Sequence, residues 1–277
     1  MFIDAINPYQ EAINYELLWA SIDNSNLKKV DDLKFKPSRL DTPLMKEDIE
    51  AFFHNLKKDF SIITHESYQY PDLLKKTYIK KLYYKGDIGL LEAPKKISIV
   101  GARKASNEGK RRARKIANIL SKEGFVIVSG LAAGIDTEAM RSTIRAGGHL
   151  IGVIGTPINE YYPKENKTLQ DEVAKNHLLL SHVPFYKYSQ QPFSTKKFYF
   201  PERNAVMAAV SDATIIIEAS ETSGTLTQAR ACMEMGRKLF ILNSCFESGL
   251  KWPHSYEERG AIRVKDTDDI LDLFKDV

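Results

Sequence analysis

The chain has 277 residues, 43% of them hydrophobic, which is enough for one large core with a small accessory domain. Its two cysteines are not in a CxxC motif, which argues against a disulfide scaffold or structural zinc site and for a reducing, cytoplasmic setting. No apolar run is long enough to span a bilayer, so a membrane protein is excluded.

Residues 1–58 predict a small helical domain. Two stretches have apolar residues at helical spacing, and a Pro- and Asp-containing loop at 36–43 separates them. The first stretch contains Tyr15, Leu17, Leu18, Trp19 and Ile22, and the second runs from about Met45 to Leu56.

Residues 59–277 predict an α/β domain. After two edge elements at 60–64 and 81–86, short β-branched runs alternate with helical segments, as expected for a doubly wound, parallel sheet of the extended Rossmann type. The expected strands are residues 97–100, 126–128, 150–154, 178–180, 214–217, 239–242 and 262–264. Residues 182–200 are expected to form one long loop, because they are rich in Pro, Ser, Tyr and Lys.

Positive charge is concentrated around the first parallel strand and the helix after it. The whole chain carries a formal net charge of +4, yet residues 95–115 hold nine bases and the single acid Glu108, so the remainder is net acidic. The bases are Lys95, Lys96, Arg103, Lys104, Lys110, Arg111, Arg112, Arg114 and Lys115. This segregation indicates either a solvated helix face or a surface that meets a polyanion.

Glycine turns follow the first two parallel strands, and they predict an anion site. Gly101 and Gly130 end the strands, and Ser129, Gly130 and Gly134 form a turn where backbone can approach a ligand closely. Arg103, with Lys104 beside it, is placed to grip a phosphate, although a surface ion pair is the alternative. Asp136 is expected to cap the following helix rather than to act in catalysis.

Two further segments add candidate contacts. Bases and aromatics are interleaved at 196–204, as a single-stranded nucleic acid requires, although such aromatics can equally be core residues. The candidates there are Lys196, Lys197, Phe200, Arg203 and Asn204. Ser223, Gly224 and Thr225 follow another strand and are expected to open a helix with free amides, which is again an anion site.

Four motifs in order resemble the DNA processing protein A family, also called DprA or Smf. They are GAR at 101–103, SGLAAGID at 129–136, FPERNA at 200–205 and EASETSGTLT at 218–227. The chain departs from the family pattern at Ala205, where an arginine is usual, at His182, and at the 242–244 turn. The loss of the arginine removes one expected phosphate contact.

The resemblance implies a non-enzymatic, cytoplasmic protein without cofactor or metal. Such a protein binds and protects incoming single-stranded DNA, transfers it to the RecA recombinase during transformation or recombination, and forms a homodimer. Many members continue into a winged-helix domain, which is not expected in this chain.

The rival class is a nucleotide-sensing or phosphoribohydrolase-like Rossmann module. Dinucleotide binding requires G-x-G-x-x-G, whereas the first strand is followed only by Gly101 and Gly109, and a Walker A lysine is absent. In the similar Lonely Guy phosphoribohydrolases a catalytic glutamate stands where this chain has Gln228, and glutamine cannot act as a general base. Hydrolysis is therefore disfavoured, while nucleotide sensing stays open.

Overall fold

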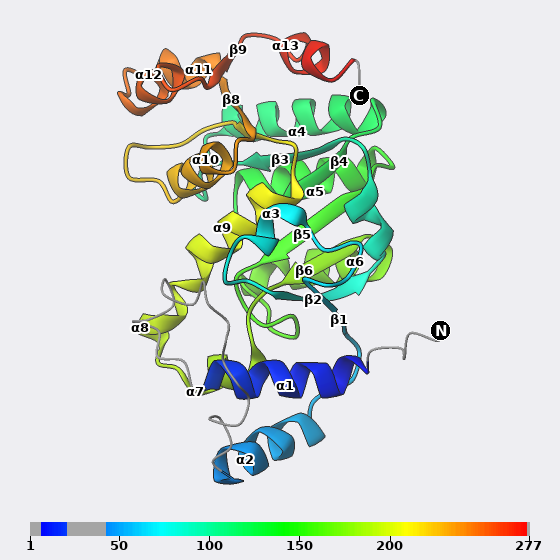
Figure 1. Ribbon diagram of the computed structural model, residues 1–277. Coiled ribbons are helices and arrows are strands. Elements are labelled where there is room, and N and C mark those ends of the chain that lie inside the picture. Colours follow the sequence, from blue (N-terminus) through cyan, green and yellow to red (C-terminus); the bar gives the residue numbers. More distant parts are fainter. Residues whose placement is uncertain (1–6, 21–42, 276–277) are drawn as a thin grey trace.

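The computed structural model describes residues 7–20 and 43–275. Figure 1 shows a twisted sheet with helices on both faces, and two helices from the N-terminal region beneath it. The helices α1 (Pro8–Ala20) and α2 (Pro43–His54) match the two helical stretches predicted from the sequence. Ile22 and the predicted loop at 36–42 lie outside the described residues.

One nine-stranded sheet forms the centre of the molecule, in the order β1-β2-β6-β5-β4-β3-β7-β8-β9. Its strands are β1 (Ser61–Thr64), β2 (Lys81–Gly86), β3 (Lys96–Val100), β4 (Val126–Ser129), β5 (Leu150–Ile154), β6 (Leu178–Ser181), β7 (Ala213–Ile216), β8 (Lys238–Leu242) and β9 (Ile262–Val264). The seven strands from β3 to β9 are parallel, as predicted, because buried β-branched runs alternate with helices. The edge strands β1 and β2 are antiparallel to their neighbours, so the sheet is mixed.

Helices cover both faces, which makes the fold doubly wound. One face packs against α4 (Asn107–Lys122), α5 (Ile135–Arg145), α6 (Lys167–Asn176) and the C-terminal turns α13 (Asp268–Leu271) and η5 (Asp272–Phe274). The other packs against α3 (Asp72–Lys75), η3 (Ile88–Glu92), α9 (Tyr199–Val210), α10 (Thr225–Glu234), α11 (Asn243–Phe246) and α12 (Trp252–Glu257).

Both cysteines are buried and free. Within the described residues, no helix is long and apolar enough to cross a membrane.

The direction of winding reverses between β3 and β7. From β3 the chain proceeds through β4 and β5 to β6, and it then returns to place β7 on the other side of β3. The turns that follow β3 and β7 therefore diverge at the carboxyl edge of the sheet. In open α/β sheets, ligands bind in the crevice at such a switch point.

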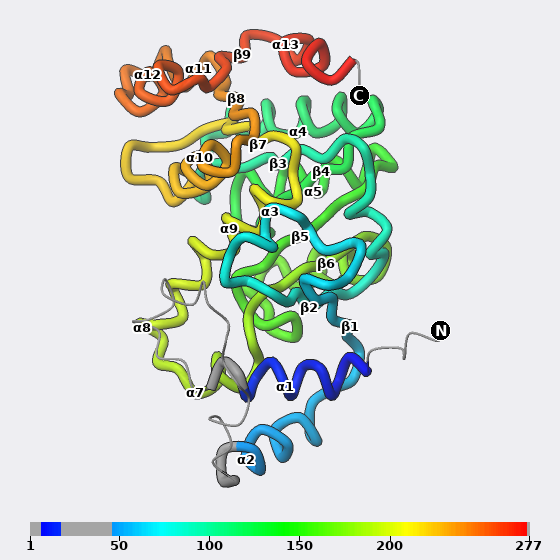
Figure 2. The backbone as a smooth tube through the Cα atoms, in the orientation of Figure 1, coloured from blue at the N-terminus to red at the C-terminus, as the bar shows by residue number. Residues whose placement is uncertain are grey.

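The N-terminal helices share a core with the sheet. Tyr15 of α1 and Phe53 of α2 pack beside Tyr83 and Phe185, with Phe53 and Phe185 ring centroids 5.8 Å apart. Figure 2 shows these helices at the opposite end of the molecule from α13. The buried carboxylate of Glu16 accepts hydrogen bonds from backbone N–H groups at the start of α7 (Phe185–Gln190). Burial raises the pKa of Glu16 to about 7.

The prediction of one long loop at 182–200 was wrong. This connection contains α7, α8 (Phe193–Lys196) and the beginning of α9. Pro184 and Pro192 each stand immediately before a helix, where the fixed φ of proline and its missing N–H cost nothing. The prolines therefore mark helix starts here, and Glu16 stabilises the first of them from a distant part of the sequence.

Candidate nucleic-acid interface

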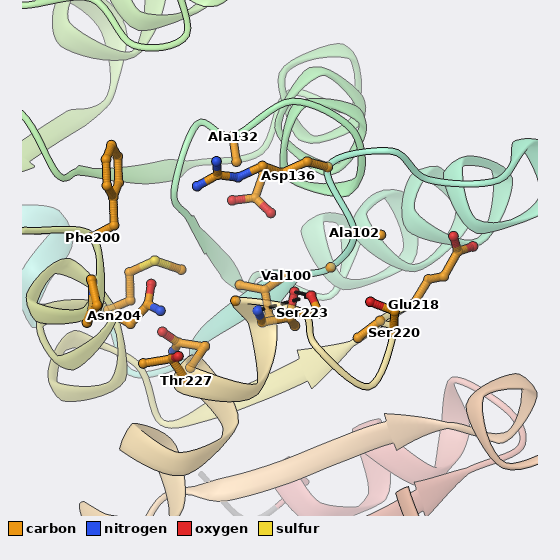
Figure 3. Close-up of a pocket in the computed structure, with 18 of the residues that line it drawn as sticks. Val100, Ala102, Ala132, Asp136, Phe200, Asn204, Glu218, Ser220, Ser223 and Thr227 are labelled. Carbon is orange, nitrogen blue, oxygen red and sulfur yellow. Dashed lines mark hydrogen bonds between the residues drawn. The ribbon is translucent and has the colours of Figure 1, made fainter. Parts of the chain in front are cut away.

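A hollow of about 650 Å³ lies at the switch point, between the turn after β3, the turn after β7 and the first turns of α9. It brings together eight of the predicted site residues, namely Arg103, Lys104, Phe200, Arg203, Asn204, Ser223, Gly224 and Thr225. Figure 3 shows Phe200 and Glu218 on opposite sides of it. The predicted turn after β3, which begins at Gly101, and the predicted turn at Ser223–Thr225 after β7 thus meet in one site.

The exposed Arg103 and the half-buried Phe200 lie together at one side of this hollow. The Arg103 guanidinium lies over the Phe200 ring, with its carbon 5.7 Å from the ring centroid, and Phe200 also contacts the ring of Tyr162 at 5.2 Å. Among the described residues, Arg103 forms no ion pair with an acidic side chain. The alternative interpretation of Arg103, a surface ion pair, is therefore wrong. A smaller hollow of about 190 Å³ adjoins this pair and is also lined by Gly130.

Arg203 differs from its neighbours because it is buried and already has partners. Its Nη1 donates to the carbonyl oxygens of Gly130 (2.7 Å) and Val153 (3.2 Å), and its Nε donates to Asn204 Oδ1 (3.0 Å). The sequence placed Arg203 among the phosphate contacts, and this bonding gives it a second, structural role. Desolvation lowers the pKa of the guanidinium, while the charge of Asp136 opposes that shift.

Asp136 does not cap its helix, contrary to the prediction. The cap position of α5 is occupied by Gly134, and the Asp136 carboxylate instead accepts a hydrogen bond from the Gly130 N–H at 3.0 Å. Burial raises the pKa of Asp136, and the charge of Arg203 opposes that rise. Asp136 and Arg203 together fix the glycine turn after β4.

Ser129 and Gly134 act within this turn and do not line either hollow. The hydroxyl of Ser129 donates to the carbonyl of Ile99, which ties β4 to β3. Gly134 has a φ of 80°, and a Cβ there would come within 2.3 Å of the Ala102 carbonyl oxygen. Only glycine fits this contact between the turns after β3 and β4.

The turn after β7 opens α10 as predicted, but the amides there are not free, because the N–H groups of Leu226 and Thr227 donate to the carbonyl oxygens of Ser223 (3.0 Å) and Gly224 (3.1 Å). Gly224 holds the cap position, and the Ser223 hydroxyl accepts a hydrogen bond from the Thr225 N–H at 3.2 Å. Deeper in the hollow, Gln228 is buried, and its Nε2 donates to the Thr214 hydroxyl at 3.2 Å. Its Oε1 has no hydrogen-bond partner within the described residues.

The side chain of Glu218, from the turn after β7, binds at the N-terminus of α4. This contact was not predicted from the sequence. The Glu218 carboxylate accepts hydrogen bonds from the Ser106 N–H (2.9 Å) and the Ser106 hydroxyl (2.5 Å). Gly109 leaves room for it, because a Cβ there would lie 2.1 Å from Glu218 Oε2. In dinucleotide-binding Rossmann folds this helix terminus holds the pyrophosphate. The position is filled here by the protein's own anion.

Lys196 and Lys197 lie outside both hollows. The Nζ of Lys196 is 4.4 Å from the Tyr188 ring centroid, and the Nζ of Lys197 is 5.5 Å from that of Phe198. Phe198 and the nearby Phe193 are 59% and 82% exposed, so this α8 region presents unpacked aromatics beside lysines. It flanks the hollow rather than forming it.

The basic cluster of α4 is partly neutralised. Arg111 and Arg112 both pair with Glu108, and Arg114 pairs with Glu138. Exposed pairs of this kind contribute little to stability. The prediction of a solvated helix face therefore describes much of α4, and the unpaired charge of Arg103 and Lys104 lies at the hollow.

The fold and site define a Rossmann-type α/β protein with a basic and aromatic hollow at its switch point. The described residues contain no group of His, Cys, Asp or Glu side chains that could hold a metal ion. A sequence model of one family, described as DNA recombination-mediator protein A, matches residues 61–275. The chain belongs to this family of DNA processing proteins, as its four motifs predicted.

Relatives from two bacteria agree with this assignment. The chain is 34% identical over 241 residues to "DNA processing protein DprA" of Bacillus subtilis, covering 82% of this chain and 78% of the relative. It is 40% identical over 195 residues to "DNA processing protein DprA" of Streptococcus pneumoniae, covering 70% and 66% respectively.

Two solved structures share the architecture. DNA processing protein A from Streptococcus pneumoniae matches with a TM-score of 0.73 and 31% identity, covering 97% of this chain and 93% of the other. DNA processing protein A from Helicobacter pylori matches with a TM-score of 0.66 and 30% identity, covering 78% and 96%. The latter structure was described for its mode of single-stranded DNA binding.

Proposed function

We propose that this protein binds single-stranded DNA in the hollow between the turns after β3 and β7. The observation that carries the proposal is the pairing of Arg103 with Phe200. Arg103 offers an unpaired charge for a phosphate, and Phe200 offers a ring on which an unpaired base can stack by replacing the guanidinium. The relative from Helicobacter pylori, described as binding single-stranded DNA, supports the same ligand.

The start of α10 adds a second source of positive potential for a phosphate. α10 begins beside the hollow with the positive end of its dipole, although the N–H groups of its first turn already donate to Ser223 and Gly224. A strand that crosses the switch point would meet Arg103 on one side and α10 on the other. Binding by positioned charge and stacking requires no catalytic group, so we propose a non-enzymatic role.

The family supports a further part of the proposal. We infer that the protein protects single strands in the cytoplasm and passes them to a RecA recombinase, acting as a homodimer. RecA filament formation on oligo-dT coated with single-strand binding protein, measured with and without this protein, tests the transfer step. An unchanged rate of filament formation would contradict it.

Binding is tested by titrating labelled oligo-dT and a matched duplex at salt concentrations from about 50 to about 200 mM. We expect preference for the single strand and a steep loss of affinity with salt, because counterions are released from the phosphates. Arg103→Ala should make the salt slope shallower by about 0.7, the contribution of one single-strand phosphate. Equal affinity for duplex, or an unchanged slope, would contradict the proposal.

The rival nucleotide module is tested in the same preparation. Release of free base from a nucleoside monophosphate, abolished by Glu218→Gln, would establish the enzymatic alternative. The carboxylate of Glu218 is held by Ser106, and Gln228 replaces the acid that hydrolysis requires. We therefore expect no turnover.

A further inference from the structure

A second hollow, of about 550 Å³, lies away from the switch point. It is formed by the segment that leads into β1, the end of β2 and the outer side of α6. The side chains of interest are four lysines and two tyrosines, and we call the site the lysine groove. They are Lys57, Lys58, Lys85, Lys175, Tyr84 and Tyr161.

Positive charge exceeds negative charge in the lysine groove. Asp59 is shared between Lys57 (3.1 Å) and Lys85 (2.9 Å), so one carboxylate faces two ammonium groups. Lys58 and Lys175 have no ion-pair partner among the residues the structure describes, and the Lys58 ammonium contacts the Tyr9 ring, whose centroid is 4.1 Å away. Lysines that only guard a sheet edge would extend into solvent, whereas the Lys85 side chain is only 18% exposed. The groove thus combines a partly buried lysine, already paired with Asp59, and two exposed lysines that have no carboxylate partner within the described residues.

Aromatic rings accompany the lysines. The Tyr161 hydroxyl donates to Asp171 at 2.7 Å, which fixes the ring against α6, and Asp171 is the second carboxylate of the groove beside Asp59. Lys167 Nζ lies 5.1 Å from the centroid of the same ring. Charge beside fixed aromatic faces is the chemistry that a single strand requires.

The lysine groove and the site at the switch point are lined by consecutive residues of one segment. Tyr161 lines the groove, while its neighbour in sequence, Tyr162, lines the smaller hollow beside Arg103 and packs on Phe200. Both tyrosines belong to the connection between β5 and α6. One short segment therefore forms the wall between two basic, aromatic sites.

We propose that the lysine groove is a second segment of the single-strand path, which DNA enters from the Phe200 site over Tyr162 and Tyr161. The proposal rests on the proposed function, since it extends the same ligand along the surface. It assigns binding to the junction of the N-terminal segment with β2 and α6, far in sequence from the glycine turns. A short oligonucleotide would fill only the switch point, and a longer one would also reach the lysines.

The test compares two lengths of oligo-dT, one of about 6 nucleotides, which a single site can hold, and one of about 20 nucleotides, which is longer than a single site holds. The variant is Lys58→Gln/Lys175→Gln, because both side chains are exposed and free of ion pairs within the described chain. The matched control is Lys122→Gln/Lys265→Gln, which removes the same charge from exposed positions outside the three hollows described above.

We expect the variant to bind the short oligonucleotide as the wild type does. For the long one, affinity should fall and the salt slope should become shallower by about 1.4, or 0.7 for each lysine. The control should change neither. Equal effects on both lengths, no effect on either, or the same effect from the control would overturn the lysine groove while leaving the proposed function intact. Failure of the wild-type protein to bind either length would overturn both.

Discussion

Replacement of Arg203 by methionine separates its structural role from DNA binding. Arg203→Met keeps much of the side-chain volume but removes the donors to Gly130 and Val153 and leaves the buried Asp136 without its neighbouring charge. The loss of a compensating charge beside a buried carboxylate is expected to cost at most about the 3 to 5 kcal/mol that breaking a buried charge pair from one side costs. At about 2 to 4 °C per kcal/mol for a domain of this size, the melting temperature should fall by at most about 6 to 20 °C.

The pH dependence of this loss has a definite sign. Burial already raises the pKa of Asp136 above 3.8, and removal of Arg203 raises it further. A carboxyl with a raised folded-state pKa binds its proton more tightly in the folded state, so the folded variant gains stability as pH falls toward that pKa. Calorimetry should therefore give a smaller difference from wild type at about pH 5 than at about pH 8.

A double variant provides the control for this reasoning. Adding Asp136→Asn removes the unpaired charge, so Arg203→Met/Asp136→Asn should recover part of the lost stability and lose the pH dependence. The reasoning is refuted if Arg203→Met melts like the wild type at both pH values and only weakens oligo-dT binding. Arg203 would then act as a phosphate ligand alone.

Two other substitutions test stacking and packing. Phe200→Ala should cost about 1 to 3 kcal/mol of oligo-dT affinity with an unchanged salt slope; a lowered melting temperature with intact affinity would make this ring a core residue. Gly109→Ala should cost about 1 to 3 kcal/mol of stability, because its Cβ would displace the Glu218 carboxylate. Gly224→Ala is the control, since a Cβ there meets nothing within 4 Å, and equal melting of the two variants would contradict the packing argument.

Local patterns were sufficient to predict the parallel strands. Each is a short, buried run dominated by branched apolar residues, so the alternation with helices could be read directly, and the glycine turns followed from it. The same local reading failed at 182–200, where prolines begin helices instead of interrupting them. The antiparallel direction of β1 and β2 was also not predicted, because strand direction depends on partners elsewhere in the chain.

The site was predicted as a set of residues but not as a set of contacts. Arg203 reaches Gly130 across 73 positions, and Glu218 reaches Ser106 across 112. No spacing rule reports such pairs, so one buried arginine was grouped with the exposed Arg103, and Asp136 was assigned to a helix cap. The presence of Gly109 inside α4 was the one local signal that something packs closely there.

The carboxylate of Glu218 also acts as a tethered competitor. Because it is part of the chain, its effective concentration at the N-terminus of α4 is on the order of millimolar or higher. A nucleoside monophosphate has a single phosphate group with which to displace it, whereas a polymer can leave that position occupied and bind through many phosphates elsewhere. On the proposed function, this competition would favour a strand over free mononucleotides.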